Sequence, residues 1–211
     1  MAASFFGEVD LKYETQFEIA GPAAIFVRPD SGASFVSYPV PTYSAIKGMF
    51  ECVARWKTAY IKPLRVEICS PIQFQSYVTN YGGPMRKRTQ IEKRASYQLF
   101  ATILVDVCYK AYGVVTEAKP APTKTNHLHA LQDLFNRRLR QGKLYRTPCL
   151  GWSEFIPSYF GPLRDHTKPR EEVDLVIPSM LHSVFSSELS GQFAPKFVQD
   201  ARVAQGVLSF A

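Results

Sequence analysis

Hydrophobic and polar residues alternate near the start of the chain, where the odd positions from Val9 to Ile19 are mostly apolar. An alternation with a period of two predicts a β-strand with one buried face. Gly21 and Pro22 are expected to interrupt this strand, because neither residue suits the middle of a regular ladder.

The apolar spacing changes after Pro41 and becomes helical. Ile46, Phe50, Val53 and Trp56 recur at the interval of one helix face, behind Thr42, a residue type that caps helices well. These positions predict a first helix that begins after Thr42.

A second amphipathic segment runs from about Asn126 to Arg140. Its apolar face consists of Leu128, Leu131, Phe135 and Leu139. Gly142 suits the end of this helix, because glycine readily adopts the left-handed backbone of a helix C-terminus.

Further strands are expected around these helices. Pro63 is expected to end the connection after the first helix, and residues 64–68 and 72–75 are strand-like with Pro71 between them. Residues 97–112 predict a long central strand, and residues 173–177 predict another. The order strand, helix, strand, strand, helix, strand indicates an α+β fold of the ferredoxin-like type.

The charge balance indicates what kind of partner the chain binds. The chain has 211 residues, of which 46% are hydrophobic, and its 25 Lys and Arg exceed its 18 Asp and Glu to give a net charge of +7. A core of this size suits one domain with a small appendage. The excess of positive charge favours a polyanion such as nucleic acid, while the alternative is an ordinary basic surface.

The cysteines and the first residues of the chain indicate where in the cell the protein is expected. Four cysteines occur without a CxxC pair, which indicates reduced thiols in a cytoplasm rather than disulfides or a zinc knuckle. The first residues lack a basic segment followed by an apolar run, and no apolar stretch approaches the ~18 residues of a membrane span. We therefore expect a cytoplasmic protein with no membrane contact.

The most basic segment lies between the strand expected at residues 72–75 and the long strand expected at residues 97–112. Five of the nine residues from 86 to 94 are Lys or Arg. The candidates for contact with an RNA backbone are Tyr81, Gly82, Gly83, Arg86, Lys87, Arg88, Lys93 and Arg94. Glycine backbone approaches phosphate closely, and Tyr77, Tyr81 and Tyr97 offer faces on which unpaired bases stack. The alternative is a solvated hairpin with ordinary turn glycines.

Arg137, Arg138 and Arg140 form a second basic group in the last turn of the second helix. They are candidates for RNA contact as well. A structural role is the rival interpretation, because cations stabilise the negative end of a helix dipole.

Cofactor and metal chemistry find no support in the motifs. His127 and His129 stand two apart and would point to different helix faces, and no nucleophile elbow, P-loop or dinucleotide fingerprint occurs.

Cleavage of RNA does not need a metal or a cofactor. RNA supplies its own nucleophile, the 2′-hydroxyl, so the protein has to position only a base, a cation and an acid. Lys124, His127 and His129 cluster at the start of the second helix, where backbone N–H groups favour an anion; surface or capping histidines are the alternative.

Several segments together resemble a known family. Residues 38–48 (Tyr-Pro-Val-Pro-Thr-Tyr-Ser-Ala-Ile-Lys-Gly) are similar to the first-helix signature of the Cas five family of CRISPR-associated RAMP proteins, in its subtype I-C (d or Dvulg) form. Residues 24–29, 71–73, 104–109, 137–142 and 148–155 resemble further segments of that family in the same order. The matches extend from about residue 17 to residue 160.

The resemblance implies a fold and a set of partners. It implies a ferredoxin-like (RRM-like) RAMP domain over residues 1–142, with the basic hairpin as an insertion, and a β-rich appendage over residues 143–211. It also implies a subunit of the Cascade surveillance complex that holds the 5′ handle of CRISPR RNA, contacts a backbone-forming subunit and a large subunit, and lies near target DNA.

The resemblance further implies cleavage of precursor CRISPR RNA without metal, but the expected residues differ here. Family nucleases carry a Tyr before the Trp that closes the first helix, whereas Ala54 and Arg55 precede Trp56. The family's Lys-His pair corresponds to Asn126-His127 if about one helical turn is inserted, or to Ala130-Leu131 if none is, and only the first alignment retains a histidine. We therefore nominate His127 as acid or base, with Lys124, Arg55 or Tyr43 in supporting roles, and Lys47 beside Tyr43 as an RNA contact.

Two alternatives remain open from the sequence. One is the same scaffold without catalysis, with processing left to a separate nuclease. The other is a DNA-binding or protein-interaction module in which the basic hairpin grips duplex DNA or a protein.

Overall fold

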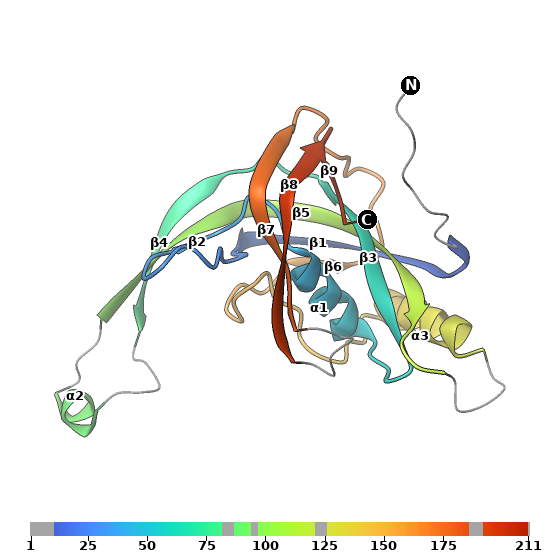
Figure 1. Ribbon diagram of the computed structural model, residues 1–211, viewed down its shortest axis with the longest axis horizontal. Helices are drawn as coiled ribbons and strands as arrows, with labels where there is room; N and C mark the ends of the chain where they lie inside the picture. Colours follow the sequence, from blue (N-terminus) through green and yellow to red (C-terminus); the bar gives the residue numbers. More distant parts are fainter. Residues whose placement is uncertain (1–10, 82–86, 94–96, 121–125, 186–191, 211) are drawn as a thin grey trace.

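The computed structural model describes the chain except residues 1–10, 82–86, 94–96, 121–125, 186–191 and 211 (Figure 1). In chain order its elements are a 3-10 helix η1 (Leu11–Tyr13), β1 (Glu14–Ala24), β2 (Phe35–Val36), α1 (Tyr43–Val53), β3 (Ala59–Ile68), β4 (Phe74–Tyr81), α2 (Arg88–Glu92), β5 (Tyr97–Glu117), α3 (His127–Gln141), β6 (Tyr159–Gly161), β7 (Leu175–Phe185), β8 (Phe193–Ala204) and β9 (Val207–Ser209). Within the described residues no helix combines the length and the apolar character needed to cross a membrane.

One sheet organises the molecule. Its strands follow the order β6-β1-β5-β3-β9-β8-β7, with β2 and β4 paired to the outer part of the long strand β5. All the pairings are antiparallel except that of β2 with β5. The expected mixture of helices with an antiparallel sheet is therefore confirmed, and the predicted central strand is β5.

The proline-based strand boundaries were wrong at two places. β1 continues through Gly21 and Pro22, with pairs to β5 on both sides of Pro22. Gly21 is suited to this position because a Cβ there would lie 2.6 Å from Leu150 Cδ1. β3 likewise begins before Pro63, and a register shift after Pro63 accommodates the proline in the strand.

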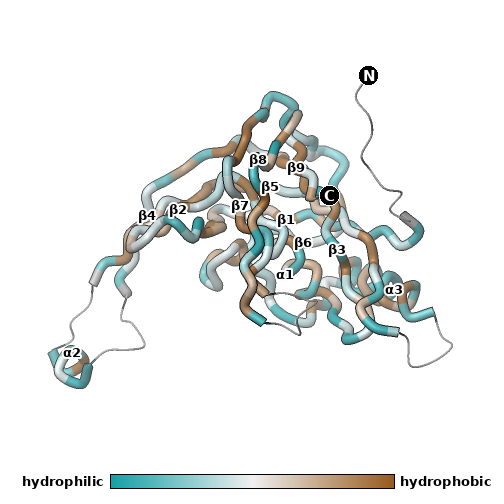
Figure 2. The backbone as a smooth tube through the Cα atoms, viewed as in Figure 1, coloured by the Kyte–Doolittle hydropathy of each residue, from teal (hydrophilic) through white to brown (hydrophobic). Residues whose placement is uncertain are grey.

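Both predicted helices are present, with the expected caps. The Thr42 side chain accepts a hydrogen bond from the Ala45 N–H (3.2 Å) at the start of α1. α3 follows Asn126, whose side chain caps the His129 N–H, and ends at Gly142 with a left-handed φ of 63°. Trp56, expected on the first helix, lies beyond its end and is 36% exposed. α3 alternates between hydrophobic and hydrophilic residues along its turns (Figure 2), as a helix with one buried face does.

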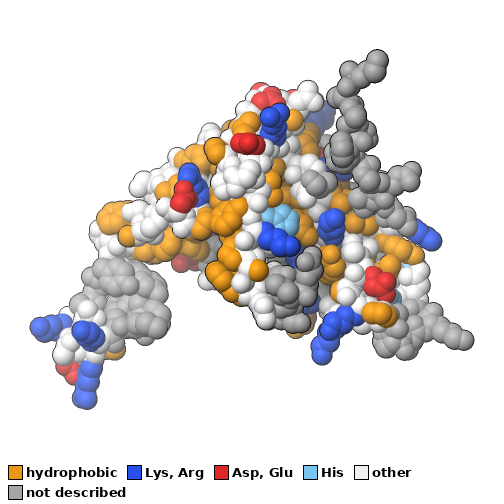
Figure 3. Space-filling view, viewed as in Figure 1, with side chains coloured by type: hydrophobic (Ala, Val, Ile, Leu, Met, Phe, Trp, Pro, Cys, Tyr) orange, Lys and Arg blue, Asp and Glu red, His pale blue; other side chains and the backbone are white. Residues whose placement is uncertain are grey.

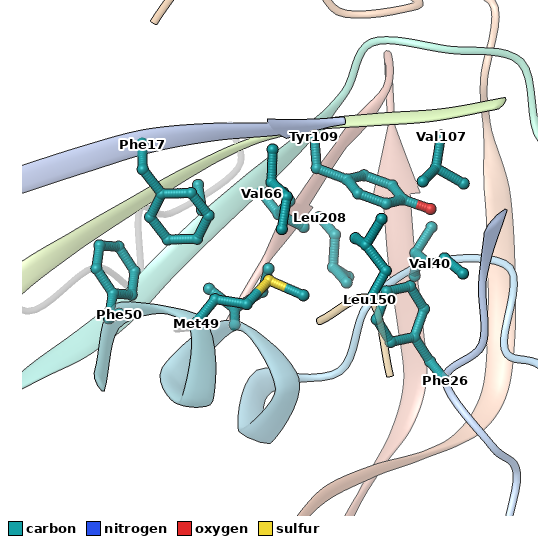
Figure 4. Close-up of a cluster of buried hydrophobic side chains, with 14 of the residues drawn as sticks. Phe17, Phe26, Val40, Met49, Phe50, Val66, Val107, Tyr109, Leu150 and Leu208 are labelled. Atoms are coloured by element: carbon teal, nitrogen blue, oxygen red, sulfur yellow. The ribbon is translucent and has the colours of Figure 1, made fainter. Parts of the chain in front are cut away.

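The core lies between the sheet and the two helices α1 and α3, which pack on the same face. Phe50 of α1 meets Phe17 of β1 edge to face at 4.8 Å and contacts Phe135 of α3 at 5.5 Å. Figure 4 shows Phe17 and Phe50 facing each other, with Leu150 close to Tyr109 farther along the sheet. This packing holds the second half of α1 against β1 and α3.

The region after α3 departs from the expected strand order. The strand beside β1 is the short β6, whereas β7, which contains the predicted strand at 173–177 in part, pairs with β8. The sequence did not mark β6, because three residues are too few to show an alternation.

A buried carboxylate attaches the segment after β6 to the sheet. Glu18 on β1 is fully buried and accepts hydrogen bonds from the Arg164 side chain (Nε, 2.8 Å), the Arg164 backbone N–H (2.7 Å) and the Thr167 hydroxyl (2.9 Å). Lys110 of β5 donates from Nζ to the carbonyl oxygens of the same two residues. Burial alone would raise the pKa of Glu18, but these hydrogen bonds hold it below its ordinary value.

Candidate nucleic-acid interface

An aromatic stack marks the N-terminal end of α1. The cap at Thr42 places Tyr43 in the first helical position, where its ring stacks on His182 of β7 with centroids 4.0 Å apart and planes at 16°. Phe210, near the C-terminus, packs edge-on against the same Tyr43 ring at 5.7 Å. The stack therefore joins α1 to the β7–β8 pair.

Lysines from three elements surround this stack. Lys47, one turn after Tyr43, places Nζ 5.1 Å from the centroid of the Tyr60 ring on β3. Burial and the positive charges of Lys196, Lys62 and Lys47 all lower the pKa of His182, with burial as the largest cause. The charged form of His182 is consequently less favoured than that of an ordinary histidine. We refer to Tyr43, Lys47, Tyr60, Lys62, His182 and Lys196 as the Tyr43–His182 cluster, and Figure 3 shows histidine with Lys or Arg side chains beside it near the middle of the drawn face.

His127 stands at a different place, at the first position of α3. Its Nε2 lies 3.8 Å from Glu117 Oε1 at the end of β5, and its side chain is only 14% exposed. This buried Nε2 has no hydrogen-bond partner among the described residues. His129 points elsewhere, with Nε2 3.3 Å from the exposed carboxylate of Asp133. Lys124, the proposed partner of His127, lies outside the described residues.

Arg55 follows the C-terminal end of α1. Its side chain is 58% exposed, and its Nε lies 3.9 Å from Glu51 on the helix. Since α1 has 11 residues, Arg55 stands about 16 Å or more along the helix axis from Tyr43. The structure thus separates two of the residues nominated for catalysis.

A cavity of about 450 Å³ opens beside Arg55, between α1 and residues 145–151. Its lining includes Cys52, Tyr145 and Arg146, while Cys149 faces the same space. Burial, as the largest cause, raises the pKa of the Cys52 thiol.

Among the described residues, no group of three or more His, Cys, Asp and Glu side chains is arranged to hold a metal ion.

The basic residues of α3 divide into two kinds. Arg138 donates a hydrogen bond from Nη1 to the Val53 carbonyl oxygen (3.0 Å) and so ties the last turn of α3 to the last turn of α1. Arg137 and Arg140 are exposed on the other sides of the helix. Arg138 therefore makes a structural contact, which differs from the helix-dipole interaction considered for this group.

The basic hairpin contains the short helix α2 beyond the ends of β4 and β5 (Figure 1). Lys87, Arg88 and Lys93 are exposed, and Arg88 Nε lies 3.0 Å from Glu92 Oε1. Gly82, Gly83, Arg86, Arg94 and the side chain of Tyr81 lie outside the described residues. The hairpin and the Tyr43–His182 cluster are separate basic surfaces.

Sequence reasoning found Tyr43 and Lys47 but missed the residues that the fold brings to them. Tyr60, Lys62, His182 and Lys196 come from β3, β7 and β8, and only the pairing of β7 with β8 sets Lys196 opposite Ser183, next to His182. The sequence held no signal for this pairing, because the residues after Ser183 show no clear alternation.

The fold and the surface define a mixed α/β protein with a basic cluster at the junction of α1 and the β7–β8 pair. Residues 16–205 match the family described as CRISPR-associated protein (Cas_Cas5), in its Cas5d form. The chain belongs to this family, which confirms the resemblance seen in the sequence.

Two curated relatives carry the same name, CRISPR pre-crRNA endoribonuclease Cas5d. The protein from Thermus thermophilus is 33% identical over 149 residues, and the match covers 69% of this chain and 62% of the relative. The protein from Mannheimia succiniciproducens is 30% identical over 170 residues, covering 72% of this chain and 73% of the relative. The chain thus spans under two thirds of the first relative's length.

Solved structures share the fold. One titled as a CRISPR-associated protein superposes with a TM-score of 0.67 at 18% identity, covering 94% of this chain and 91% of that one. A chain from a structure titled CRISPR RNA-guided surveillance complex gives a TM-score of 0.52 at 16% identity, covering 92% and 91% of the two chains.

Proposed function

We propose that this chain binds CRISPR RNA as a subunit of a type I-C-like Cascade surveillance complex, where it holds the 5′ handle of the RNA. The observation that carries the proposal is its membership of the Cas5 family over residues 16–205, with relatives named pre-crRNA endoribonuclease. Exposed Lys and Arg on α2 and α3, together with the half-buried Lys47 and Lys62 of the Tyr43–His182 cluster, supply charge for a phosphodiester backbone.

We also infer a ferredoxin-like RAMP core. The elements β1, α1, β3, β5, α3 and β6 follow the order β-α-β-β-α-β of that fold, and their strands are adjacent in the sheet as β6-β1-β5-β3. Division of the chain into residues 1–142 and a β-rich appendage at 143–211 remains a prediction. The placement of β7, β8 and β9 after the core strands supports a β-rich appendage, whereas β6 lies beyond residue 142 and pairs with β1, so the core would extend past this boundary to β6.

Contacts with protein subunits find support in exposed apolar residues at two strand ends. Phe185 of β7 and Phe193 of β8 pair with centroids 6.4 Å apart, although 64% and 73% of these residues are exposed. Val78 and Phe100, also exposed, are paired positions across β4 and β5. Exposed apolar pairs of this kind favour a protein partner.

A cytoplasmic location fits the four free thiols of the described chain.

The second part of the proposal is cleavage of the precursor RNA without metal. The 2′-hydroxyl next to the scissile phosphate would attack once a base removes its proton, and the leaving 5′-oxygen would take a proton from an acid. His127 is the candidate for either role. Its Nε2 is buried and lies 3.8 Å from Glu117, which would orient the ring, so the RNA would have to meet the other ring nitrogen, Nδ1. Arg55, at the end of α1, would stabilise the charge on the phosphate.

The non-catalytic scaffold is the second candidate. It is favoured by Arg55 at the position where the family nucleases carry Tyr, and by the separation of Tyr43 from Arg55 along α1. In this case the RNA would be bound but cut by another protein.

Incubation of the purified protein with labelled repeat RNA in EDTA separates the two candidates. The nuclease predicts one discrete cut in the repeat and, for His127→Ala, a rate lower by about 100-fold or more. His129→Ala is the matched control, because His129 sits on the same turn but faces Asp133, and it should cut at the wild-type rate. Tight binding with no cut would support the scaffold and reject the catalytic role of His127.

A further inference from the structure

Cys69 and Cys108 lie opposite each other where the outer part of the sheet branches away from β3. β3 and β4 both pair with the edge of β5 that faces away from β1. The pairing with β3 ends at Ile68, and the pairing with β4 begins at Phe74. We refer to β4 and the residues of β5 that pair with it (97–104) as the β4–β5 arm, which extends to the left in Figure 1. The two cysteines therefore stand at the base of this arm.

The backbone holds the two cysteines in direct register. The Cys69 N–H donates to the Cys108 carbonyl oxygen (2.8 Å), which continues the antiparallel register of Ile68 with Tyr109 by one pair. Opposite residues in such a hydrogen-bonded pair have Cα atoms about 5.5 Å apart and side chains on the same face of the sheet. A disulfide needs a Cα separation of about 4.4–6.8 Å, so the backbone meets this requirement without moving.

The two sulfur atoms differ in their surroundings. Cys108 is buried, and its Sγ lies 3.5 Å from Glu18 Oε1 and 3.9 Å from Arg164 Nη2. Cys69 is half-buried, and its Sγ lies 3.9 Å from the Glu67 carbonyl oxygen. The Cys69 thiol also hydrogen-bonds to the Cys108 sulfur, and this bond is the largest cause that lowers the pKa of Cys108. A small oxidant therefore reaches the pair through Cys69, while Cys108 is held beside it as the second thiol.

The other two cysteines of the chain provide a comparison. Cys52 and Cys149 line the cavity beside α1, one from the helix and the other from the segment after α3. No strand register joins them in the described part of the chain, and Cys149 Sγ lies 3.5 Å from the Gly151 carbonyl oxygen. Among the four free thiols, only those of Cys69 and Cys108 are paired across strands.

We propose that Cys69 and Cys108 form a reversible disulfide when the protein meets a peroxide, and that this bond fixes the base of the β4–β5 arm to β3. In this reaction the two S–H bonds and the O–O bond of hydrogen peroxide break, and one S–S bond forms. The sulfurs give up two electrons, and the peroxide oxygens leave with the two protons as two water molecules. Two molecules of a small thiol would reverse the reaction and be oxidised to their own disulfide. This modification site is independent of the proposed RNA binding.

The disulfide should change both stability and the motion of the base of the arm. It would close a covalent loop over residues 69–108, which stabilises the folded chain because it restricts the unfolded one. The Cys108 thiol would stop donating to Glu18, but the hydrogen bonds from Arg164 and Thr167 to this carboxylate would remain. We therefore expect the melting temperature to rise by about 5 °C or more on oxidation.

Treatment of the fully reduced, full-length chain with hydrogen peroxide tests the site. The intact mass should fall by that of two hydrogen atoms, and peptide mapping after alkylation of the remaining thiols should identify one cross-link, between Cys69 and Cys108. Dithiothreitol should restore the reduced mass and the lower melting temperature. Amide hydrogen exchange in residues 70–74 should slow in the oxidised chain, whereas that in β7 should not change.

Two variants separate this pair from the other thiols. Cys52→Ser/Cys149→Ser removes the two thiols outside the pair, so it should retain the cross-link and the rise in melting temperature. Cys69→Ser should lose both. Its melting temperature in the reduced state verifies that this change at a half-buried position preserves the fold.

The mapped products decide between the outcomes. A cross-link between any other two cysteines, or oxidation of Cys69 to a sulfinic acid without a cross-link, would overturn the disulfide. A cross-link at Cys69 and Cys108 without slower exchange in residues 70–74 would keep the modification site and overturn its effect on the arm. Because the cross-link is mapped in the wild-type chain, this result does not depend on whether a variant folds.

Discussion

At the scale of single residues, the buried carboxylate of Glu18 accepts several hydrogen bonds from side chains and backbone. Arg164, Thr167 and Cys108 all donate hydrogen bonds to it, and its side chain has no exposed surface. Removal of the charge leaves the Arg164 guanidinium, whose side chain is 30% exposed, without its carboxylate partner. Because water reaches part of that guanidinium, the cost is expected at about 3 kcal/mol, the low end for breaking a buried pair. Glu18→Gln should lower the free energy of unfolding by this amount in urea titrations at pH 7.

The same carboxylate predicts how stability depends on acid. Its pKa in the folded chain lies below the ordinary value of 4.5, so its contribution is complete above that value and is lost as pH falls through the folded pKa. Wild type and Glu18→Gln should therefore converge in stability in strong acid. Glu171→Gln, which changes an exposed carboxylate outside the ion pairs of the described residues, is the control and should retain the acid dependence of the wild type. A constant difference between wild type and Glu18→Gln at all pH values would contradict the assignment.

Glu18 also shows what sequence patterns miss at this scale. The alternation that identified β1 placed Glu18 among the polar, outward residues, and it correctly placed Phe17 and Ile19 in the core. Burial of Glu18 depends on Arg164 and Thr167, which reach it from a segment far along the chain. A periodic pattern describes one strand and carries no information on what covers its other face.

At the scale of elements, glycines give a test of α1 and of the close packing beside it. Gly48 lies inside α1 with open space around its missing Cβ, so Gly48→Ala should raise the free energy of unfolding by about 0.5–1 kcal/mol. Gly151 has a φ of +100°, and a Cβ there would overlap the Ile25 carbonyl, so Gly151→Ala should lower the melting temperature sharply. Thermal unfolding should show a higher melting temperature for Gly48→Ala and a lower one for Gly151→Ala. A higher melting temperature for Gly151→Ala would contradict the close packing of Gly151 on Ile25.

Helix caps and apolar faces were readable from the sequence, whereas strand ends at prolines were not. Thr42 and Gly142 act through contacts within one turn, so local composition predicts them well. Pro22 and Pro63 lie inside β1 and β3, because a neighbouring strand can pair on both sides of a position that donates no hydrogen bond. Whether a proline ends a strand depends on its neighbours in the sheet.

At the scale of the whole molecule, the residues of the Tyr43–His182 cluster are brought together by strand pairing that no local pattern predicts. The family resemblance supplied the partner, and the sequence supplied Tyr43, Lys47 and the basic hairpin. His182, Lys62 and Lys196 join Tyr43 only because β9 connects β3 to the β7–β8 pair. The fold therefore determines where RNA would be held, and it separates this place from the His127 corner that is proposed to cut.

The most direct test of CRISPR RNA binding is a comparison of three probes with the wild-type chain at one salt concentration. The affinity for the CRISPR repeat RNA should exceed that for an RNA of the same length and shuffled sequence by about tenfold or more, which corresponds to about 1.4 kcal/mol. Duplex DNA of the repeat sequence should bind no better than the shuffled RNA. Equal affinity for all three probes would contradict the account, because it would leave only a nonspecific attraction between a basic surface and a polyanion.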